Sequence, residues 1–549
     1  MPSVDSRSGF CLETKTFHSL RPPTSLPPES LPISAAAFSF SLLPSPLPSN
    51  PALIDAATGA SISFTDLISQ TRSLAAALAS AGLVYPGDVA FVVAPSRLDI
   101  PVLYLALLSL GVVVSPVNPV STASEIAHQI NISNPSVAFA TAAAASKIPL
   151  HVKTLILDFP SFRSLLSDPS PPSTPSTPSP EIRQSHAAAI LYSSGTTGRV
   201  KGVVITHRNF IALTAGSHAG RERLLKASEE AGEPMASGAG LFTIPLFHMY
   251  GFFMLLRAVA GGETTVLMER FEFGAMLSAV EKYSVTFMPA APPLVVAMTK
   301  SSEVVGRDLS SLQIVRVGGA PLGRELAELF RARFPRVEIV QAYGLTESAG
   351  IAEAMIGSEE SQVYGSAGRI SSNLEAKIVD PTSGEALGPR QRGELWIRGP
   401  TIMKGYVGDD EATKSTLDLE GWLKTGDLCY FDEDGFLFIV DRLKELIKYK
   451  AYQVPPAELE HILQSHPEIA DAAVIPYPDE EAGQIPMAFI VRKPNSIVTD
   501  KQVMDFVAKQ VAPYKKIRRV AFVSSIPKSA AGKILRRELM NYATSIPAL

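Results

Sequence analysis

Cysteine is almost absent from this chain of 549 residues: only Cys11 and Cys429 occur, far apart and outside any C-x-x-C pair. A disulfide scaffold and a cysteine-based zinc site are therefore not expected. The nine histidines include no H-E-x-x-H spacing, which argues against a metalloprotease helix. So few thiols fit a reducing compartment inside the cell.

An excess of either charge is also missing, because 49 basic residues face 53 acidic ones and the formal net charge is -4. No nucleic-acid partner is expected, since such partners call for strongly basic surfaces. The longest hydrophobic run, residues 101–114, is interrupted by Ser109 and Gly111 and falls short of the ~20 residues that span a bilayer. This run predicts a buried helix and no membrane span.

What is present is a large apolar fraction, 46% of the chain, which is enough for two or more domains. Proline gathers in residues 22–51 and in the low-complexity segment 167–180, which predicts an extended, solvated loop. Elsewhere short apolar or β-branched runs alternate with helical periodicities, and this alternation predicts an α/β fold with largely parallel sheets. The predicted strands are 89–93, 112–114, 152–157, 188–192, 203–206 and 264–268, and the predicted helices are 64–82 and 100–110.

The second half of the chain has a different texture, with short strands predicted between Gly and Pro turns at 375–379, 393–397 and 436–440. These strands indicate a β-rich subdomain. The remaining residues indicate a further unit, with helices at 455–463 and 503–511 and strands at 473–475 and 487–490. From Lys501 onward ten basic residues face two acidic ones, which fits either a solvated helix face or a local phosphate-handling surface.

Residues 192–202 read YSSGTTGRVKG and directly follow a predicted strand. Glycines let the backbone curl, so that amides and hydroxyls converge on phosphate oxygens, and Lys201 adds a positive charge. The hydroxyls available are those of Ser193, Ser194, Thr196 and Thr197. The segment departs from the Walker pattern, and an ordinary polar turn is the alternative.

Residues 341–348 read QAYGLTES and follow the apolar strand 338–340. The exits of strands in open parallel sheets are where ligands bind. Glu347 is therefore a candidate to hold a magnesium ion on ATP, with a plain surface carboxylate as the alternative.

Three more motifs follow: WLKTGD at 422–427, DRLKELIKYK at 441–450 and PKSAAGK at 527–533. With all five motifs in this order, the chain resembles the adenylate-forming superfamily of acyl-CoA synthetases, peptide-synthetase adenylation domains and beetle luciferases. It looks most like the plant 4-coumarate–CoA ligase-like branch, from Phe17 to Tyr542. The resemblance implies an α/β AMP-binding N-terminal domain over residues 1–440 and a small mobile α+β C-terminal lid domain over 441–549.

The resemblance also implies the reaction, an ATP-dependent acid–CoA ligation that passes through an acyl-adenylate, with ATP, Mg²⁺ and CoA as its requirements. The expected acid is apolar and of the hydroxycinnamate or cinnamate type. Benzoates, medium- or long-chain fatty acids and cyclopentanone precursors of jasmonate stay open, as does a carrier-protein loader or a nucleotide-binding pseudoenzyme. The chain is expected to act as a monomer.

Site residues follow by resemblance, motif by motif. The expected ATP and AMP ligands are Ser193, Ser194, Gly195, Thr196, Thr197, Gly198, Lys201, Gln341, Ala342, Tyr343, Gly344, Thr346, Asp427 and Arg442. Glu347 would bind magnesium, and Asp441 would lie at the hinge of the small domain.

The first half-reaction brings two anions together, the substrate carboxylate and the α-phosphate. Lys533, beside Gly532, is the cation that can sit between them, and a snorkelling surface lysine is the alternative. For the second half, the resemblance implies a rotation that withdraws Lys533 and brings in Lys448 and Gln453. By the same carry-over His248 would orient the thiol, and the residues that contact CoA would be Arg270, Lys450 and Ala451.

The acyl pocket is carried over by position. Its expected residues are Met249, Tyr250, Phe253, Ala290, Ala291, Arg316, Gly318, Ala342, Ile351 and Ala352. Compared with the family's Val-Leu pair, Ile351-Ala352 predicts a deeper floor. Two further departures are Trp396 in the GELWIRG segment and Ala451 where the family has Gly, the latter predicting weaker CoA binding or a tolerated change.

The chain ends in Pro547-Ala-Leu549, which keeps the terminal Leu of a peroxisomal signal and lacks its basic middle residue. We therefore expect the cytosol, with the peroxisome as the alternative.

Overall fold

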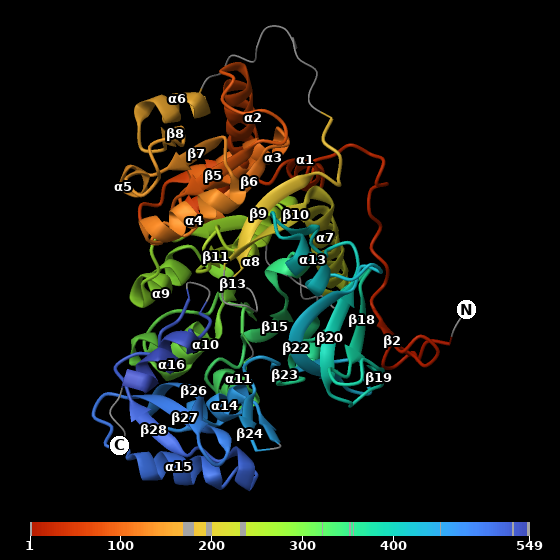
Figure 1. The fold of residues 1–549 in the computed structure, drawn as a ribbon. Helices are drawn as coiled ribbons and strands as arrows, with labels where there is room; N and C mark the ends of the chain where they lie inside the picture. Colours follow the sequence, from red (N-terminus) through yellow and green to blue (C-terminus); the bar gives the residue numbers. More distant parts are fainter. Residues whose placement is uncertain are drawn as a thin grey trace.

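The computed structural model describes residues 3–167, 181–193, 200–230, 238–320, 322–350, 353–354, 356–450, 452–529 and 532–545. Three sheets belong to the large domain and a fourth belongs to the small domain at the C-terminal end (Figure 1). All of the low-complexity segment after residue 167 lies outside the described residues.

The first sheet has seven strands in the order β21-β10-β9-β6-β5-β7-β8. Neighbours from β9 to β8 are parallel, whereas β10 is antiparallel to β9 and to β21. The strands are β5 (Val89–Val93), β6 (Val113–Val117), β7 (Val137–Ala140), β8 (Thr154–Ile156), β9 (Ala187–Ser193), β10 (Lys201–Thr206) and β21 (Gly405–Tyr406). The prediction of a largely parallel sheet is confirmed here.

The second sheet runs β17-β16-β15-β14-β13-β11-β12-β3-β4 and is parallel from β15 through β3. Its strands are β3 (Pro51–Asp55), β4 (Ser61–Ser63), β11 (Ala239–Phe242), β12 (Thr264–Leu267), β13 (Val285–Ala290), β14 (Ile314–Val317), β15 (Glu338–Tyr343), β16 (Glu353–Ala354) and β17 (Arg369–Ile370). Because parallel strands leave a sheet at one edge, the exits of β13, β14 and β15 lie together.

Helix α3 (Asp99–Ser109) is apolar on all sides and buried along nearly its whole length, as the sequence predicts for residues 101–114. Pro101 falls in the first turn, where a missing N–H disturbs no helical hydrogen bond. Tyr104 stacks on Phe252 at 4.8 Å, and Phe252 stacks on Phe210 at 4.9 Å. Three helices, α3, α7 (His207–Glu230) and α8 (Met249–Ala260), thus share one aromatic core.

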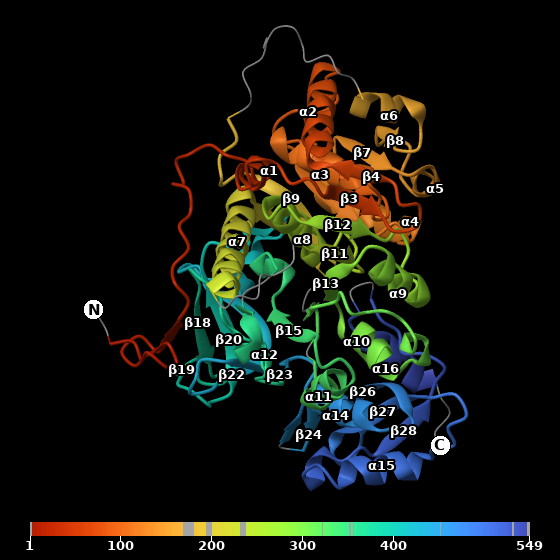
Figure 2. The same cartoon turned by 180° about the vertical axis from the view of Figure 1, so that it is seen from behind.

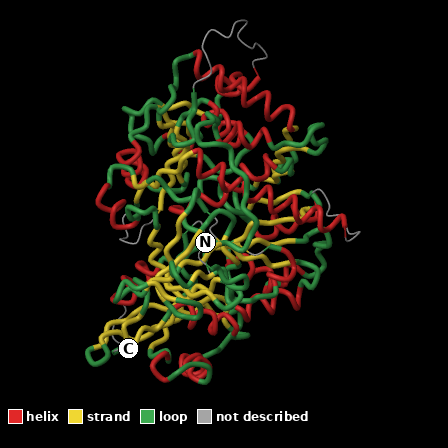
Figure 3. Tube along the Cα trace, turned by 90° about the vertical axis from the view of Figure 1, so that its right-hand side faces the viewer, coloured by secondary structure: helices red, strands yellow, loops and turns green. Residues whose placement is uncertain are grey.

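The other helices of the large domain cover these sheets (Figures 2 and 3), and α1 packs against α7 through Phe38, Ile211 and Ala215. They are α1 (Ala35–Ser41), α2 (Phe64–Ser80), α4 (Ala123–Ser133), α5 (Ala142–Ala145), α6 (Pro160–Ser167), α9 (Phe273–Lys282), α10 (Pro292–Lys300), α11 (Arg324–Arg333), α12 (Gly357–Ser361) and α13 (Asp410–Thr416).

The third sheet is antiparallel and confirms the predicted β-rich subdomain. Its main order is β1-β2-β18-β20-β22-β23, with β19 paired to β18. The strands are β1 (Phe10–Cys11), β2 (Thr16–His18), β18 (Glu375–Val379), β19 (Ala386–Leu387), β20 (Gly393–Arg398), β22 (Leu423–Phe431) and β23 (Leu437–Arg442).

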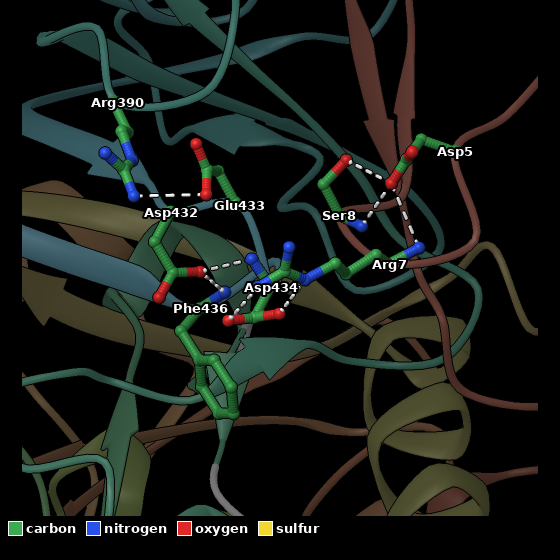
Figure 4. Close-up of polar contacts among 8 residues, drawn as sticks. All are labelled: Asp5, Arg7, Ser8, Arg390, Asp432, Glu433, Asp434 and Phe436. Carbon is green, nitrogen blue, oxygen red and sulfur yellow. Dashed lines mark hydrogen bonds and ion pairs between the residues drawn. The ribbon is translucent and has the colours of Figure 1, made fainter.

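The N-terminal segment is bound to this sheet by polar contacts as well as by β2 (Figure 4). Asp5 accepts from the backbone N–H groups of Arg7 and Ser8, and Arg7 forms an ion pair with Asp434. Asp432 caps the β22–β23 turn by accepting from the Asp434 backbone N–H. The start of the chain is therefore fixed to residues more than four hundred positions away.

The small domain is a five-stranded sheet in the order β25-β24-β27-β26, with β28 parallel to β27. Its strands are β24 (Ile447–Tyr449), β25 (Tyr452–Val454), β26 (Ile469–Asp479), β27 (Gly483–Arg492) and β28 (Arg519–Phe522), and its helices are α14 (Pro456–Ser465), α15 (Asp500–Ala508) and α16 (Arg536–Ser545). A core of Ile447, Leu459, Val474 and Ile490 holds helices and sheet together.

Candidate active site

The exit of β15 and the paired strands β22 and β23 meet the small domain around a cavity of about 620 Å³. A crevice outside strand exits is where open α/β sheets bind ligands. Three segments distant in the sequence converge here: the β15 exit, the β22–β23 pair and the loop before α16. The predicted site residues that line the cavity are Gln341, Ala342, Tyr343, Gly344, Asp427, Arg442 and Lys533.

Asp427 is a buried carboxylate in the cavity wall, with only 3% of its surface exposed. The Tyr343 hydroxyl donates to its Oδ2 over 2.7 Å, and Arg442 Nε lies 3.1 Å from its Oδ1. Antiparallel pairing sets Asp427 opposite Arg442 in register. Burial raises the pKa of Asp427, whereas Arg442 and Tyr343 favour its charged form. A carboxylate held this way has lone pairs left to accept donors from a ligand.

Glu347 lies in the 3₁₀ turn Thr346–Ser348 after β15 and faces the first sheet. Ser193 Oγ and the Tyr406 hydroxyl both donate to its Oε1, over 2.9 and 3.0 Å. Lys201 Nζ lies 4.6 Å from the centroid of the Tyr406 ring. The ends of the predicted phosphate loop, Ser193 and Lys201, thus flank Glu347, while Ser194, Gly195, Thr196, Thr197 and Gly198 lie outside the described residues.

Tyr406 is a neighbour of this carboxylate that the sequence analysis did not identify. It comes from β21, which pairs with β10 across two hundred residues of sequence. Burial, followed by the charge of Glu347, raises the pKa of Tyr406, so the phenol stays protonated and keeps donating. No motif contains this residue, and only the long-range pairing reveals it.

Glu347 suits a magnesium ion that a nucleotide brings with it. Mg²⁺ is commonly bound in proteins by one or two carboxylates together with substrate phosphates. Within the described residues, no group of three or more His, Cys, Asp or Glu side chains is placed to hold a metal. A single carboxylate beside the phosphate loop fits a site in which the protein and the nucleotide phosphates bind the magnesium ion together.

Lys533 reaches the cavity from a tight loop. The loop is closed by Gly532 N–H donating to Ser529 O and Ser529 N–H donating to Lys533 O, both over 2.8 Å. Gly532 has φ +79°, and a Cβ there would lie 3.0 Å from Ala291 Cβ, so this position needs glycine. Burial, and then the nearby Arg442, lowers the pKa of Lys533 to about 8. The ammonium is thus poorly solvated, with the cations Arg442 and Lys444 and the carboxylates Glu445 and Asp427 all close enough to affect it.

The β24–β25 hairpin lies apart from this cavity. Lys448 and Gln453 are opposite each other in register and both are exposed. Lys448 N–H donates to Gln484 Oε1 over 2.8 Å, and Lys450 Nζ lies 2.7 Å from Glu481. Lys450 has φ +51°, while Ala451 lies outside the described residues. In this arrangement the structure does not bring Lys448 and Gln453 to Lys533.

The predicted acyl-pocket residues of α8 lie next to the second sheet. The Tyr250 hydroxyl donates to Arg316 O over 3.1 Å, and a Cβ on Gly318 would lie 3.4 Å from the Tyr250 ring. Met249 and Phe253 are buried on the same helix. Ala290 ends β13, Ala291 follows it, and Ile351 and Ala352 lie outside the described residues.

His248 immediately precedes α8 and is buried. Burial lowers its pKa to about 4, and its Nδ1 has no hydrogen-bond partner in the described part of the chain. The imidazole is therefore neutral near pH 7.

A second cavity, of about 1100 Å³, opens beside the first. Exposed Arg270 lies on its wall, together with Ala291. The two cavities share the walls Pro293, Ala297, Lys528 and Gly532. The two cavities therefore adjoin at α10 and at the loop that carries Gly532.

One interdomain contact, that of Lys300, was missed by sequence analysis, whereas Asp441 was expected at the hinge. Lys300, at the end of α10, donates from Nζ to Gln464 O over 2.7 Å and to Ile469 O over 2.9 Å, joining the two domains. Asp441 accepts from Arg442 N–H and from Ala457 N–H, and burial raises its pKa to about 6. Lysine contacts with backbone carbonyls leave no sequence signature.

Among the residues that the structure describes, no helix is both long and apolar enough to cross a bilayer.

A model of the AMP-binding enzyme family matches residues 45–407, and a model of the AMP-binding enzyme C-terminal domain matches residues 458–533. The 4-coumarate–CoA ligase-like protein 5 of Oryza sativa subsp. japonica is 60% identical over 547 residues, covering 99% of this chain and 97% of the relative. Peroxisomal OPC-8:0-CoA ligase 1 of Arabidopsis thaliana is 46% identical over 564 residues, covering 99% of both.

A solved structure of o-succinylbenzoate CoA synthetase from Bacillus subtilis, in complex with its acyl-adenylate intermediate, superposes with a TM-score of 0.76. It is 26% identical, with 92% of this chain and 98% of that chain covered. These similarities confirm the resemblance drawn from the five motifs and the division into a large N-terminal and a small C-terminal domain. The chain belongs to the AMP-binding enzyme family, and it is an acid–thiol ligase that forms acyl-CoA through an adenylate.

Proposed function

We propose that this ligase activates a cinnamate-type aromatic acid and transfers it to CoA. The observation that carries the mechanism is the shared cavity, in which Lys533 of the small domain lies with Asp427 and Arg442 of the paired strands β22 and β23. Relatives named as 4-coumarate–CoA ligase-like support the aromatic acid. A fatty acid or a jasmonate precursor is the alternative, and the relative named as an OPC-8:0-CoA ligase favours it.

Nucleotide binding divides between the two sides of the cavity. Asp427 accepts hydrogen bonds from the ribose hydroxyls, and Arg442 helps to bind the ribose and the phosphate. The residues from Gln341 to Thr346, at the exit of β15, line the sites of the adenine and of the acyl-adenylate. The segment 193–198 and Lys201 hold the β- and γ-phosphates. Backbone amides and hydroxyls in such a loop form a concave donor surface suited to phosphate oxygens.

Glu347 would hold the magnesium ion. When bound with ATP, this ion neutralises phosphate charge and orients the pyrophosphate leaving group. Ser193 and Tyr406 fix the carboxylate from one side and so orient it toward the nucleotide.

In the first half-reaction, a carboxylate oxygen of the acid attacks the α-phosphorus of ATP, and the bond to pyrophosphate breaks. Lys533 stabilises the charge that develops between the two anions. A positioned cation in a site with little water does this without reorganising solvent. The product is the acyl-adenylate.

In the second half-reaction, the CoA sulfur attacks the acyl carbonyl and AMP leaves. We place the boundary between the two domains after residue 440, so that rotation about Asp441 withdraws Lys533 and brings in Lys448 and Gln453. Arg270, Lys450 and Ala451 contact CoA. Neutral His248 orients the thiol end, as a buried acceptor rather than as a charge.

The cytosol stays the predicted compartment, and the peroxisome is the alternative. A relative named as peroxisomal supports that alternative.

The test combines two assays on one acid panel of cinnamates, benzoates and medium-chain fatty acids. Pyrophosphate release with ATP and Mg²⁺ reports the first half-reaction, and thioester formation on adding CoA reports both. Thioester from cinnamates alone supports the proposal. Thioester from fatty acids alone replaces the substrate, and nucleotide binding without pyrophosphate release indicates the pseudoenzyme.

A further inference from the structure

Among the described residues, Lys533 Nζ has no hydrogen bond or ion pair, although two carboxylates lie near it. Burial, and then a nearby arginine, lowers the pKa of Lys533, whereas Glu445 and Asp427 act in the opposite direction. A poorly solvated ammonium attracts any carboxylate that can reach it. Asp427 is already paired with Arg442 and Tyr343. The position of Glu445 therefore needs a separate explanation.

Arg536 holds Glu445. Its Nη1 lies 3.2 Å from Oε2 of Glu445, and its Nη2 lies 2.9 and 2.8 Å from the two carboxylate oxygens of Glu460. Glu460 accepts in addition from the Val474 backbone N–H over 2.8 Å. One guanidinium thus joins two carboxylates, one after β23 and one on α14. The planar fork of an arginine suits such a double pairing.

The place of Arg536 in the fold is explained by these pairings. It lines the same cavity as Lys533, and 13% of its side chain is exposed. Arg536 begins helix α16, an end at which the helix dipole disfavours a cation. The two carboxylates compensate for this, so their pairing and not the helix favours an arginine here.

Two other charged groups face this cluster without taking the place of Arg536. Asp441 already accepts from two backbone N–H groups, over 2.7 and 2.9 Å. Lys444 lies close enough to lower the pKa of Lys533, so it adds to the positive charge around the ammonium. In the described part of the chain, Arg536 is therefore the ion-pair partner of Glu445.

We propose that Arg536 is a positioning residue for the first half-reaction, because it binds Glu445 and so keeps the Lys533 ammonium available to the two anionic substrates. The inference rests on the proposed acid–CoA ligation and adds to it a residue that acts through another side chain. Without Arg536, the Glu445 carboxylate is released into a poorly solvated cavity in which Lys533 is a nearby cation. Their ion pair then has to break before the acid and the α-phosphate can bind Lys533.

Loss of Arg536 should have two effects on Lys533 that a merely structural role would not combine. The pKa of Lys533 should rise, because a released carboxylate favours the ammonium form. The first half-reaction should nevertheless slow, because the ammonium is occupied. General damage to the cavity would slow the reaction without raising this pKa.

The experiment compares Arg536→Met and Arg536→Lys with the control Arg537→Met, which makes the same change at an exposed position of the same helix. Glu445→Gln is introduced into the wild type and into both Arg536 variants. Pyrophosphate release is measured across neutral and alkaline pH with the most active acid of the panel. The pKa of Lys533 is measured without substrates, by competitive labelling with acetic anhydride and mass spectrometry. Calorimetry of AMP binding checks that the cavity is intact.

In Arg536→Met, pyrophosphate release at neutral pH is expected to slow at least about tenfold, since a charge-assisted hydrogen bond has to break first. The labelling midpoint of Lys533 should move roughly one pH unit above that of the wild type. Arg536→Lys should fall between, because an ammonium lacks the fork that holds two carboxylates. Adding Glu445→Gln should restore most of the rate and lower the midpoint again. Arg537→Met should match the wild type.

An unchanged labelling midpoint in both Arg536 variants overturns the inference, whatever happens to the rate. A loss of rate that Glu445→Gln does not relieve overturns it as well. If Arg536→Met fails to fold, Arg536→Lys supplies both readings. Absence of pyrophosphate release from the wild type with every acid overturns the proposed function instead, and the labelling midpoints then decide whether Arg536 controls Lys533.

Discussion

The small domain presents two lysines in opposite ways. Lys533 is half-buried in the interdomain cavity, on a loop that Ser529 closes and in which a Cβ at Gly532 would crowd Ala291. Lys448 is exposed on a hairpin that lines neither cavity. One orientation of the domain therefore offers one lysine to the site at a time. In the proposed mechanism this is the orientation for making the adenylate.

The largest effect is expected from Lys533→Ala, which removes the cation between two anions. The rate of pyrophosphate release should fall about a thousandfold, because positioned charge of this kind contributes that much to a reaction. A preformed acyl-adenylate should still be converted to thioester. Single-turnover assays of each half separate the two effects, with Lys501→Ala on exposed α15 as control. An equal loss of rate in both half-reactions would contradict the assignment of Lys533 to the first one alone.

Lys448→Ala should show the reverse pattern, with a smaller effect. Conversion of preformed adenylate to thioester is expected to slow about a hundredfold, in the lower range for loss of one stabilising group. Pyrophosphate release should stay at the wild-type level, since Lys448 is remote from the cavity in the present orientation. If pyrophosphate release falls as well, the assignment of Lys533 to the first half-reaction and of Lys448 to the second is contradicted.

The pH dependence of the first half-reaction should report Lys533. Its ammonium is needed, and burial lowers its pKa to about 8, so the active form is present below pH 8 and lost above it. The kcat/KM for ATP should fall about fivefold between pH 8 and 9, because half of the ammonium is already deprotonated at pH 8 and kcat/KM follows the ionisation of the free enzyme. Thioester formation from preformed adenylate should lack this step. A flat profile up to pH 9.5 would show that another group supplies the charge.

Lys300→Met should give the smallest effect and test what holds the orientation. It removes two hydrogen bonds from a charged donor to the backbone of the small domain. Pyrophosphate release is expected to slow roughly fivefold, while conversion of adenylate stays constant or quickens, since the alternative orientation becomes easier to reach. The alkaline fall of the Lys533 profile should persist in this variant. If Lys300→Met changes only the thermal stability of the protein and neither half-reaction, Lys300 has a structural role alone.

Local patterns predicted many of the elements closely. The helix predicted over 64–82 is Phe64–Ser80, and the strand predicted over 89–93 is Val89–Val93. The strands predicted over 473–475 and 487–490 were too short, because β26 and β27 extend over Ile469–Asp479 and Gly483–Arg492. Pro476 and Pro486 interrupt the strand signal there, yet they lie opposite each other in the hairpin.

Contacts between segments distant in the sequence could not be predicted from such local patterns. Residues 10–18 carry no signal that they join a sheet with strands after residue 370. Tyr406 and Lys300 belong to no motif, and their partners are Glu347 and backbone carbonyls far along the chain. The order of motifs identified which chemistry to expect, while the roles of individual residues stay predictions for the half-reaction assays.

The sequence by itself determined the enzyme family and the reaction class, because the motifs keep residue types that phosphate and adenylate chemistry requires at fixed spacings along the chain. Only the tertiary structure decided which of these residues meet at one cavity and which lysine faces it. It also decided that Arg316 Nε is buried without a hydrogen-bond partner among the described residues. Pairing and burial depend on which segments the fold brings together, and a charge is unpaired only in relation to all of its neighbours in space.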